Sequence, residues 1–253
     1  AKVPLTTREA FGRREGNNFV SVDYDTLELR TLAQAAIWLT GSSNLATVLN
    51  EGLDPHLDLA ALMLGITYEE AVSRKKAEDK EISHHRTLAK AANFGFPGGL
   101  SANSFASYAK TSTGGKLRLT KDQSQSIKAY WNGKWPEMPA YFRSIEANRS
   151  GQFYDVEMFG SGLMRSQCLY TAACNCYFQG LAAHGAKRAL YLAVRAAFNE
   201  PNSPFYGSRP VMFIHDEIIA EVPEDRTHEA GAELSRIMCD AMQAVVPDVR
   251  ITA

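Results

Sequence analysis

The chain has 253 residues, 45% of them hydrophobic and 22% charged, which is enough for a sizeable core in one large domain or two small ones. No apolar run approaches the roughly 18 residues of a membrane span, and residues 1–4 carry no apolar leader, so we expect a cytoplasmic protein without a membrane partner. The formal net charge of -1 lacks the basic footprint of many nucleic-acid-binding proteins, but ten Lys and Arg oppose three acids between Arg74 and Lys121.

The predicted elements begin with a strand over 19–23, because Val20 and Val22 alternate with other residues after a turn-forming Gly-Asn-Asn. Helical periodicity then takes over from about Leu27 to Leu39. A later helix is predicted from an N-cap at Ser83 to about Phe96, where a Pro-Gly-Gly run ends it. Further predictions are helices over 56–64, 68–76, 121–130, 170–198 and 224–245, and a hairpin of strands 211–214 and 218–222.

Strands at both ends of the chain enclose a helical middle. This order predicts a mixed α/β fold of the α+β type, with an antiparallel sheet built from distant segments and a mostly helical insertion. Within the helical part, Trp131 and Trp135 are predicted to pack in the core rather than to stack on bases.

Two aspartates lie at rigid points of the predicted sheet. Asp23 ends the first strand and Asp216 lies at the hairpin turn. A single strand-end aspartate is usually a cap or a turn former, but two in these contexts could share two magnesium ions about 4 Å apart. Glu217 follows Asp216, and only a turn would let both side chains approach one site. Tyr24 could add its backbone carbonyl to the metal ligands.

Cationic and aromatic side chains recur at a spacing of four on the helix that ends near Phe96. Arg86, Lys90 and Phe94 therefore share one face, with a rise of about 6 Å from one to the next. A triphosphate along that face would meet a guanidinium and an ammonium, and a base could rest on the aromatic ring. The alternative is a solvated basic face with Phe94 buried. Neighbouring alanines and Gly95 favour close approach by a ligand.

Three segments together resemble motifs A, B and C of the A-family DNA polymerases, the group that includes bacterial DNA polymerase I and many phage replicases. They are Asp23-Tyr24-x-x-x-Glu28-Leu29-Arg30, Arg86-x-x-x-Lys90-x-x-Asn93-Phe94-Gly95 and His215-Asp216-Glu217. The resemblance covers about 20–245. It implies a discontinuous palm, residues 1–30 and 166–253, and a fingers subdomain, residues 31–165.

The resemblance also implies roles for individual residues around the nucleotide. Asp23 and Asp216 match the metal-binding aspartates, which would hold two Mg²⁺ ions, with Mn²⁺ as a possible substitute. Glu28 matches the residue that blocks a ribose 2'-hydroxyl. The remaining positions match catalytic or nucleotide-binding residues: Glu217 and Lys90 for catalysis, and Tyr24, His56, Arg86, Lys90 and Phe94 for the incoming deoxynucleotide (dNTP).

On the DNA side, the resemblance implies contacts with a primer-template duplex. His215 matches a residue near the primer terminus, and Asn175 and Gln179 match side chains that touch the minor groove. Acceptors in that groove are nearly the same for every base pair, so donors there check the shape of a pair without reading its sequence.

The sequence departs from the family pattern in several places. Gly98 replaces a tyrosine that stacks at the template position, Thr171 replaces an arginine and Thr26 replaces a glutamine. We therefore expect that the template base is positioned more loosely or by another residue. The thumb, the first part of the palm and a proofreading exonuclease would precede Val20, so we expect them to be absent and an upstream domain or chain to supply the thumb.

The sequence thus predicts a DNA-templated DNA polymerase that works by a two-metal mechanism, as a C-terminal fragment that lacks the thumb. Three alternatives stay open. The chain could be a silent DNA-binding or assembly module derived from the fold, a relative of single-subunit RNA polymerases, or a two-metal nuclease. Glu28 argues against the second and the cationic helix against the third.

Overall fold

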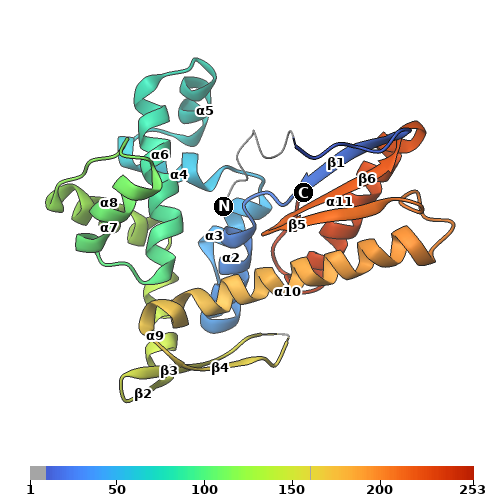
Figure 1. The fold of residues 1–253 in the computed structure, drawn as a ribbon. Helices are drawn as coiled ribbons and strands as arrows, with labels where there is room; N and C mark the ends of the chain where they lie inside the picture. The colour runs from blue at the N-terminus through green and yellow to red at the C-terminus, as the bar shows by residue number, and fades with distance from the viewer. Residues whose placement is uncertain (1–9, 160) are drawn as a thin grey trace. The chain divides into compact units, whose positions relative to one another are not determined.

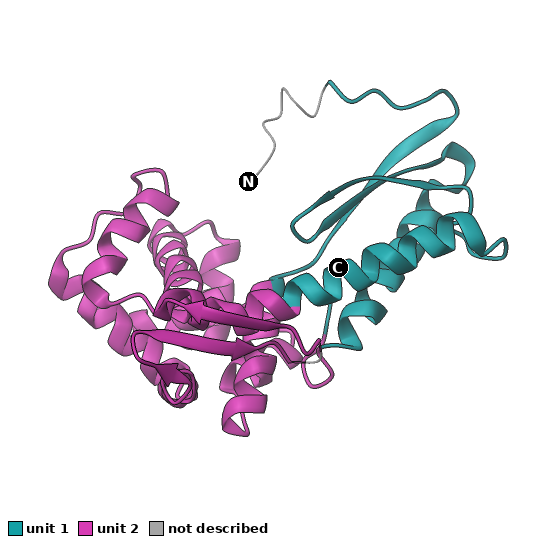
Figure 2. Ribbon diagram, turned by 60° about the horizontal axis from the view of Figure 1, so that its bottom comes forward, with its two compact units in different colours: residues 1–27, 182–245, 251–253 teal, residues 28–181, 246–250 magenta. Residues whose placement is uncertain are grey.

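The structure is a computed structural model that describes residues 10–159 and 161–253, so the expectation about residues 1–4 lies outside the described part. The chain forms two compact units (Figure 2). Unit 1 comprises the chain up to Leu27 with 182–245 and 251–253, and unit 2 comprises 28–181 with 246–250. The predicted palm and fingers boundaries stay a prediction.

Unit 1 is built on a three-stranded antiparallel sheet in the order β1-β6-β5. The strands are β1 (Asn17–Asp23), β5 (Arg209–Ile214) and β6 (Glu217–Pro223), so the predicted first strand and hairpin are confirmed. After a short 3-10 turn, η2 (Glu224–Arg226), helix α11 (Thr227–Gln243) packs against β1 and β6 (Figure 1). Apolar side chains of the sheet and helix, such as Ile218 and Leu234, are fully buried between them.

The long helix α10 (Tyr170–Asn199) matches the predicted helix almost to the residue. It runs through both units, since 170–181 belong to unit 2 and 182–199 to unit 1. In the described part of the chain, no helix is long and apolar enough to cross a membrane.

Unit 2 is mainly helical, as predicted for the middle of the chain. Trp131 and Trp135 are each 1% exposed, which confirms their prediction as core residues. The elements are α2 (Leu27–Thr40), α3 (Asn44–Asn50), α4 (Pro55–Leu64), α5 (Tyr68–Lys76), α6 (Lys80–Gly95), η1 (Phe96–Gly98), α7 (Ala102–Ser112), α8 (Lys121–Lys134) and α9 (Met138–Glu146).

The predicted start of α6 at Ser83 was wrong. Asp79 is the N-cap, and its carboxylate accepts hydrogen bonds from the backbone amides of Glu81 at 2.7 Å and Ile82 at 3.4 Å. Aspartate caps a helix as well as serine does, and it comes one turn earlier in the chain. The Ser83 hydroxyl instead donates to the Asp79 carbonyl at 2.8 Å.

Unit 2 also holds a small antiparallel sheet that the sequence pattern did not predict. Its order is β2-β3-β4, with β2 (Arg149–Ser150), β3 (Phe153–Glu157) and β4 (Met164–Cys168). The strands are short, and β4 is exposed along most of its length, so it lacks the apolar alternation that marks a half-buried strand.

Candidate active site

The carboxyl groups predicted to bind metal come together at one end of the sheet of unit 1. In the antiparallel register Asp23 on β1 lies opposite Glu217 on β6, and Asp216 belongs to the two-residue turn that precedes Glu217. The side chains of Asp23 and Asp216 are hydrogen-bonded to each other. Both Asp216 and Glu217 therefore lie close enough to Asp23 for their charges to act on its carboxyl group.

This crowding changes the protonation of Asp23. Partial burial of the carboxyl, then the negative charges of Asp216 and Glu217 and the hydrogen bond with Asp216, raise the pKa of Asp23 above its usual value. A hydrogen bond from the backbone amide of Tyr24 works in the opposite direction. Two carboxylates this close favour either a shared proton or a cation between them.

Ser21 is a member of this cluster that the sequence motifs did not indicate. It lies two residues before Asp23, so both side chains project from the same face of β1. Its hydroxyl donates a hydrogen bond to the carboxylate of Glu217. The sequence could have indicated Ser21, because residues two apart on a strand share a face and Ser21 lies two residues before a predicted metal ligand.

Non-glycine residues with positive φ flank the acids. His215, the first residue of the hairpin turn, has φ 57°, and Thr26, three residues after Asp23, has φ 49°. Glycine normally supplies such a conformation, and a β-branched threonine is especially unfavourable there. Strain of about 1–3 kcal/mol per residue is typical of functional sites.

Tyr24 contributes to the site through its backbone rather than its ring. The ring is buried, and its hydroxyl donates to the carbonyl of Met238 on α11 at 2.6 Å. Burial raises the pKa of Tyr24 well above its usual value. The ring thus fixes the backbone next to Asp23, and metal binding by the Tyr24 carbonyl stays a prediction.

The donor set fits magnesium better than a softer metal. In 10–159 and 161–253 no group of three or more His, Cys, Asp or Glu side chains is arranged to hold an ion. Magnesium, however, commonly takes only one or two carboxylates and completes its shell with water and substrate phosphates. The Asp23 and Asp216 carboxylates meet that requirement. Burial contributes most to the raised pKa of Asp23, and a cation would relieve the repulsion from Asp216 and Glu217 that adds to it.

In unit 2, the predicted cationic residues lie on α6, and one of them is already paired. The Arg86 Nε donates to Oδ2 of Asp54 at 2.8 Å, and the Lys75 ammonium lies 3.3 Å from the same oxygen. Asp54 also caps α4. Partial burial disfavours the charged form of Asp54, but the hydrogen bond and charge of Arg86 outweigh it, so the pKa of Asp54 is lowered. Asp54 therefore holds the guanidinium by Nε.

Lys90 and Phe94 form the exposed part of the same face. The Lys90 ammonium is 5.9 Å from the centre of the Phe94 ring. Phe94 is only partly exposed, and on its other side lies His56, with 5.4 Å between the ring centres. His56 is 2% exposed, so this predicted triphosphate ligand is a buried side chain beneath the face rather than on it.

Glu28 and Gln179 are neighbours in unit 2. The Gln179 amide donates to Oε1 of Glu28 at 3.3 Å, which links the predicted ribose-excluding residue to a predicted minor-groove residue. Asn175, one turn earlier on α10, donates to the carbonyl of Thr171 at 2.8 Å. Its amide also fills the space beside Gly98, where an added Cβ would lie 3.0 Å from Asn175 Nδ2.

The opening predicted at Gly95 is filled by the protein itself. A Cβ on Gly95 would lie 2.8 Å from Cε1 of Tyr108, a residue of α7. Tyr108 also interacts electrostatically with Glu28: burial and then the negative charge of Glu28 raise the pKa of the Tyr108 phenol. The expectation that Gly95 leaves room for a ligand was thus wrong, and Tyr108 is a site neighbour that no sequence motif indicated.

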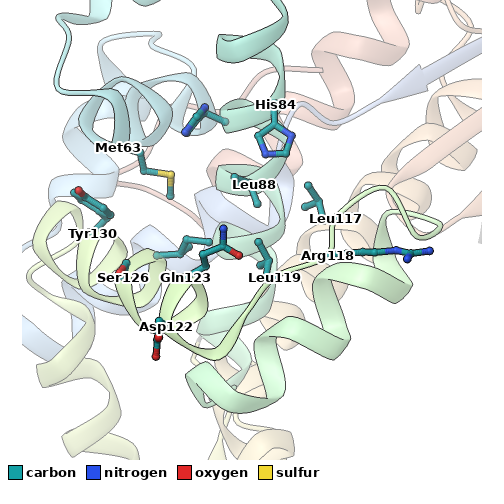
Figure 3. A pocket seen from close by; sticks show the side chains of 12 residues that line it. Met63, His84, Leu88, Leu117, Arg118, Leu119, Asp122, Gln123, Ser126 and Tyr130 are labelled. Carbon is teal, nitrogen blue, oxygen red and sulfur yellow. The ribbon is translucent and has the colours of Figure 1, made fainter.

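A cavity of about 510 Å³ lies on another side of α6, between α6, α8 and the loop before α8 (Figure 3). Its walls are mostly apolar, for example Leu88, Leu117 and Ile127, and His84 and Arg118 add polar groups. None of the predicted site residues lines it, so we assign it no part in the predicted binding of metal or nucleotide.

Comparison with known proteins identifies relatives of this chain. The chain is 29% identical over 251 residues to the thermostable DNA polymerase I of Thermus filiformis, which is 95% of this chain and 27% of that protein. It is 28% identical over 253 residues to DNA polymerase I of Chloroflexus aurantiacus, covering 96% of this chain and 24% of that protein. A solved structure, the POL domain of Pol1 from M. smegmatis in complex with DNA primer-template and dNTP, matches 97% of this chain and 40% of that chain with a TM-score of 0.71 and 22% identity.

The structural match shows that the chain has the fold of a polymerase domain. The family model of DNA polymerase family A matches residues 2–252, and the chain belongs to that family. Enzymes of this family generally use divalent metal ions. The chain spans about a quarter of the length of the two curated relatives named above.

Proposed function

We propose that this chain carries the nucleotidyl-transfer centre of a DNA-templated DNA polymerase. The observation that carries the proposal is the carboxyl pair of Asp23 and Asp216, hydrogen-bonded and with a raised pKa at Asp23, at the end of the sheet in a family A chain. Two Mg²⁺ ions, or Mn²⁺ in their place, would neutralise the triphosphate and activate the primer 3'-hydroxyl when bound there.

In the proposed reaction the primer 3'-oxygen forms a bond to the α-phosphorus, and the bond from that phosphorus to pyrophosphate breaks. Asp23 and Asp216 supply the hard oxygen ligands. Glu217, held by the Ser21 hydroxyl, adds negative charge beside them. His215 is exposed in the strained turn next to Asp216, where we propose that it meets the primer terminus.

The triphosphate is proposed to bind Arg86 and Lys90. Arg86 uses Nε for Asp54, which leaves the two terminal nitrogens of the guanidinium fork for phosphate oxygens. Lys90 is exposed next to the Phe94 ring, so phosphate on the ammonium would place the sugar and base near the ring. Both cations would stay with the pyrophosphate as it leaves.

Selection of deoxynucleotides is proposed for Glu28, whose carboxylate is held by Gln179. A side chain in that place clashes with a 2'-hydroxyl, which separates this proposal from an RNA polymerase. Asn175 and Gln179 are proposed to face the minor groove of a primer-template duplex. The thumb would come from an upstream domain or chain.

The test is primer extension on a primed DNA template with dNTPs and magnesium. Asp23→Asn and Asp216→Asn should each lower the rate at least about a thousandfold, because the metals supply several kcal/mol of transition-state stabilisation. Asp225→Asn, an exposed acid of the same unit, is the matched control and should leave the rate unchanged. Equal rates in wild type and both active-site variants would refute the proposal.

A second assay decides between the proposal and a silent DNA-binding module. If the folded chain extends no primer but binds dNTP, and Arg86→Ala abolishes that binding, the nucleotide face is intact and a missing region is needed for catalysis. If it binds duplex DNA but no dNTP, the binding module is the better description.

A further inference from the structure

A buried hydrogen-bond network in unit 2 connects α8 to α4 through one side chain of α6. Asn93, which is 1% exposed, receives hydrogen bonds at Oδ1 from the indole nitrogens of Trp131 at 3.1 Å and Trp135 at 3.0 Å. Its Nδ2 lies 3.2 Å from the carbonyl of Pro55 and 3.0 Å from Nδ1 of His56. The carboxamide thus has four partners.

The chemistry of these partners fixes the protons. An indole nitrogen can only donate, so the atom of Asn93 that faces Trp131 and Trp135 is the oxygen. A backbone carbonyl can only accept, so the atom that faces Pro55 is the nitrogen. The second proton of that nitrogen points to Nδ1 of His56, which must accept it with a lone pair. A neutral His56 therefore carries its proton on Nε2.

The surrounding charges are consistent with a neutral ring. Burial lowers the pKa of His56 to about 4, against the attraction of Asp54, and the positive charges of Arg86, Lys90 and Lys75 lower it further. Asp54 is the N-cap of α4, Lys75 lies on α5, and Arg86 and Lys90 lie on α6. From α8, Lys134 pairs with Asp58 at 2.7 Å.

We propose that Asn93, locked by the two indoles, is the positioning residue that holds His56 as the neutral tautomer protonated at Nε2. The part of this inference that concerns nucleotide binding rests on the proposed function and deepens it. Arg86 and Lys90 then carry the positive charge of the triphosphate face, and His56 supports that face as a neutral hydrogen-bond donor.

Nuclear magnetic resonance of ¹⁵N-histidine-labelled protein tests the proposal without substrate, with the His56 signals assigned by their loss in His56→Gln. The wild type should show an unprotonated Nδ1 and a protonated Nε2 from about pH 5 to about pH 8. Asn93→Asp keeps the size and both indole contacts but replaces the donor by a carboxylate. It should move a proton to Nδ1 and bring the pKa of His56 to about 6.5 or above.

Asn148→Asp is the matched control, because Asn148 belongs to the same unit and bonds Tyr177 instead. It should leave the His56 signals unchanged. A wild-type His56 protonated at Nδ1 would overturn the inference even if Asn93→Asp did not fold, and so would a folded Asn93→Asp with an unchanged His56 titration. Equal primer-extension rates in wild type, Asp23→Asn and Asp216→Asn would refute the proposed function and would leave this result standing.

Discussion

At the scale of single residues, the acids of unit 1 form a site that a cation would stabilise, because without a cation their negative charges repel one another. Asp23 has neighbours of like charge in Asp216 and Glu217, and its pKa is raised. The folded protein disfavours the charged form of such a carboxyl group. As the pH rises past the pKa of the group in the unfolded chain, the group therefore lowers the free energy of unfolding. The charged form of Asp23 that would bind a metal ion is therefore also the form that lowers the stability of the metal-free protein.

The first prediction is that Asp216→Asn removes activity without lowering stability. The substitution removes a like charge beside Asp23, so the pKa of Asp23 should fall toward its usual value and the melting temperature at pH 7 should stay equal or rise. Thermal unfolding of wild type, Asp216→Asn and the control Asp225→Asn in metal-free buffer measures this. A clear drop in melting temperature for Asp216→Asn alone would mean that the pair stabilises the fold.

The second prediction concerns acid and His56. Its folded pKa, about 4, lies below the usual 6.5, so the unfolded chain takes up the proton first as the pH falls. Stability from this residue is complete above about pH 6.5, is lost progressively toward pH 4, and amounts to about 3 kcal/mol over that window. Urea unfolding across the window should show a steeper loss in wild type than in His56→Gln. Parallel pH dependences would contradict the buried neutral histidine.

At the scale of elements, α6 is packed on several sides at once. Asp79 caps its start, Asn93 ties it to α4 and α8, and Gly95 near its end lies against the ring of Tyr108. Packing at these points therefore holds the helix that carries the cationic face. This arrangement suits the placement of Arg86 and Lys90 with little side-chain or backbone reorganisation on binding.

The third prediction tests the closeness of α6 and α7. Gly95→Ala would place a Cβ 2.8 Å from the Tyr108 ring, and overpacking of this kind costs about 1–3 kcal/mol. Tyr108→Ala should relieve part of that cost, giving a favourable coupling of at least about 0.5 kcal/mol in a double-mutant cycle. Gly133→Ala on α8 meets no atom within 4 Å and should be neutral or slightly stabilising. A neutral Gly95→Ala would mean that Tyr108 is not packed on the helix.

At the scale of the whole molecule, local sequence patterns were sufficient to predict most of the secondary structure. The strand ending at Asp23, the hairpin around Asp216 and the long helix α10 follow from alternation, turn residues and helical spacing, and all three are confirmed. The N-cap at Asp79 was missed because two good capping residues lie a turn apart. The bonds of Asn93 and the contact of Tyr108 with Gly95 could not be predicted, since they join segments whose proximity only tertiary packing decides.

The two units contain different parts of the proposed chemistry, with the acids in unit 1 and the cations in unit 2. Because the chain spans about a quarter of the length of the curated relatives named above, a failed primer extension alone would not separate a wrong metal centre from a missing region. The metal centre itself can be tested on unit 1 residues in the intact chain.

The most direct measurement is therefore Mn²⁺ binding to the intact chain, followed by the relaxation of water protons, in wild type, Asp23→Asn, Asp216→Asn and Asp225→Asn. We predict that wild type and Asp225→Asn bind the ion, that both active-site variants lose at least about tenfold in affinity, and that Mg²⁺ displaces it. Equal affinity in all four proteins would contradict the claim that Asp23 and Asp216 form the metal centre.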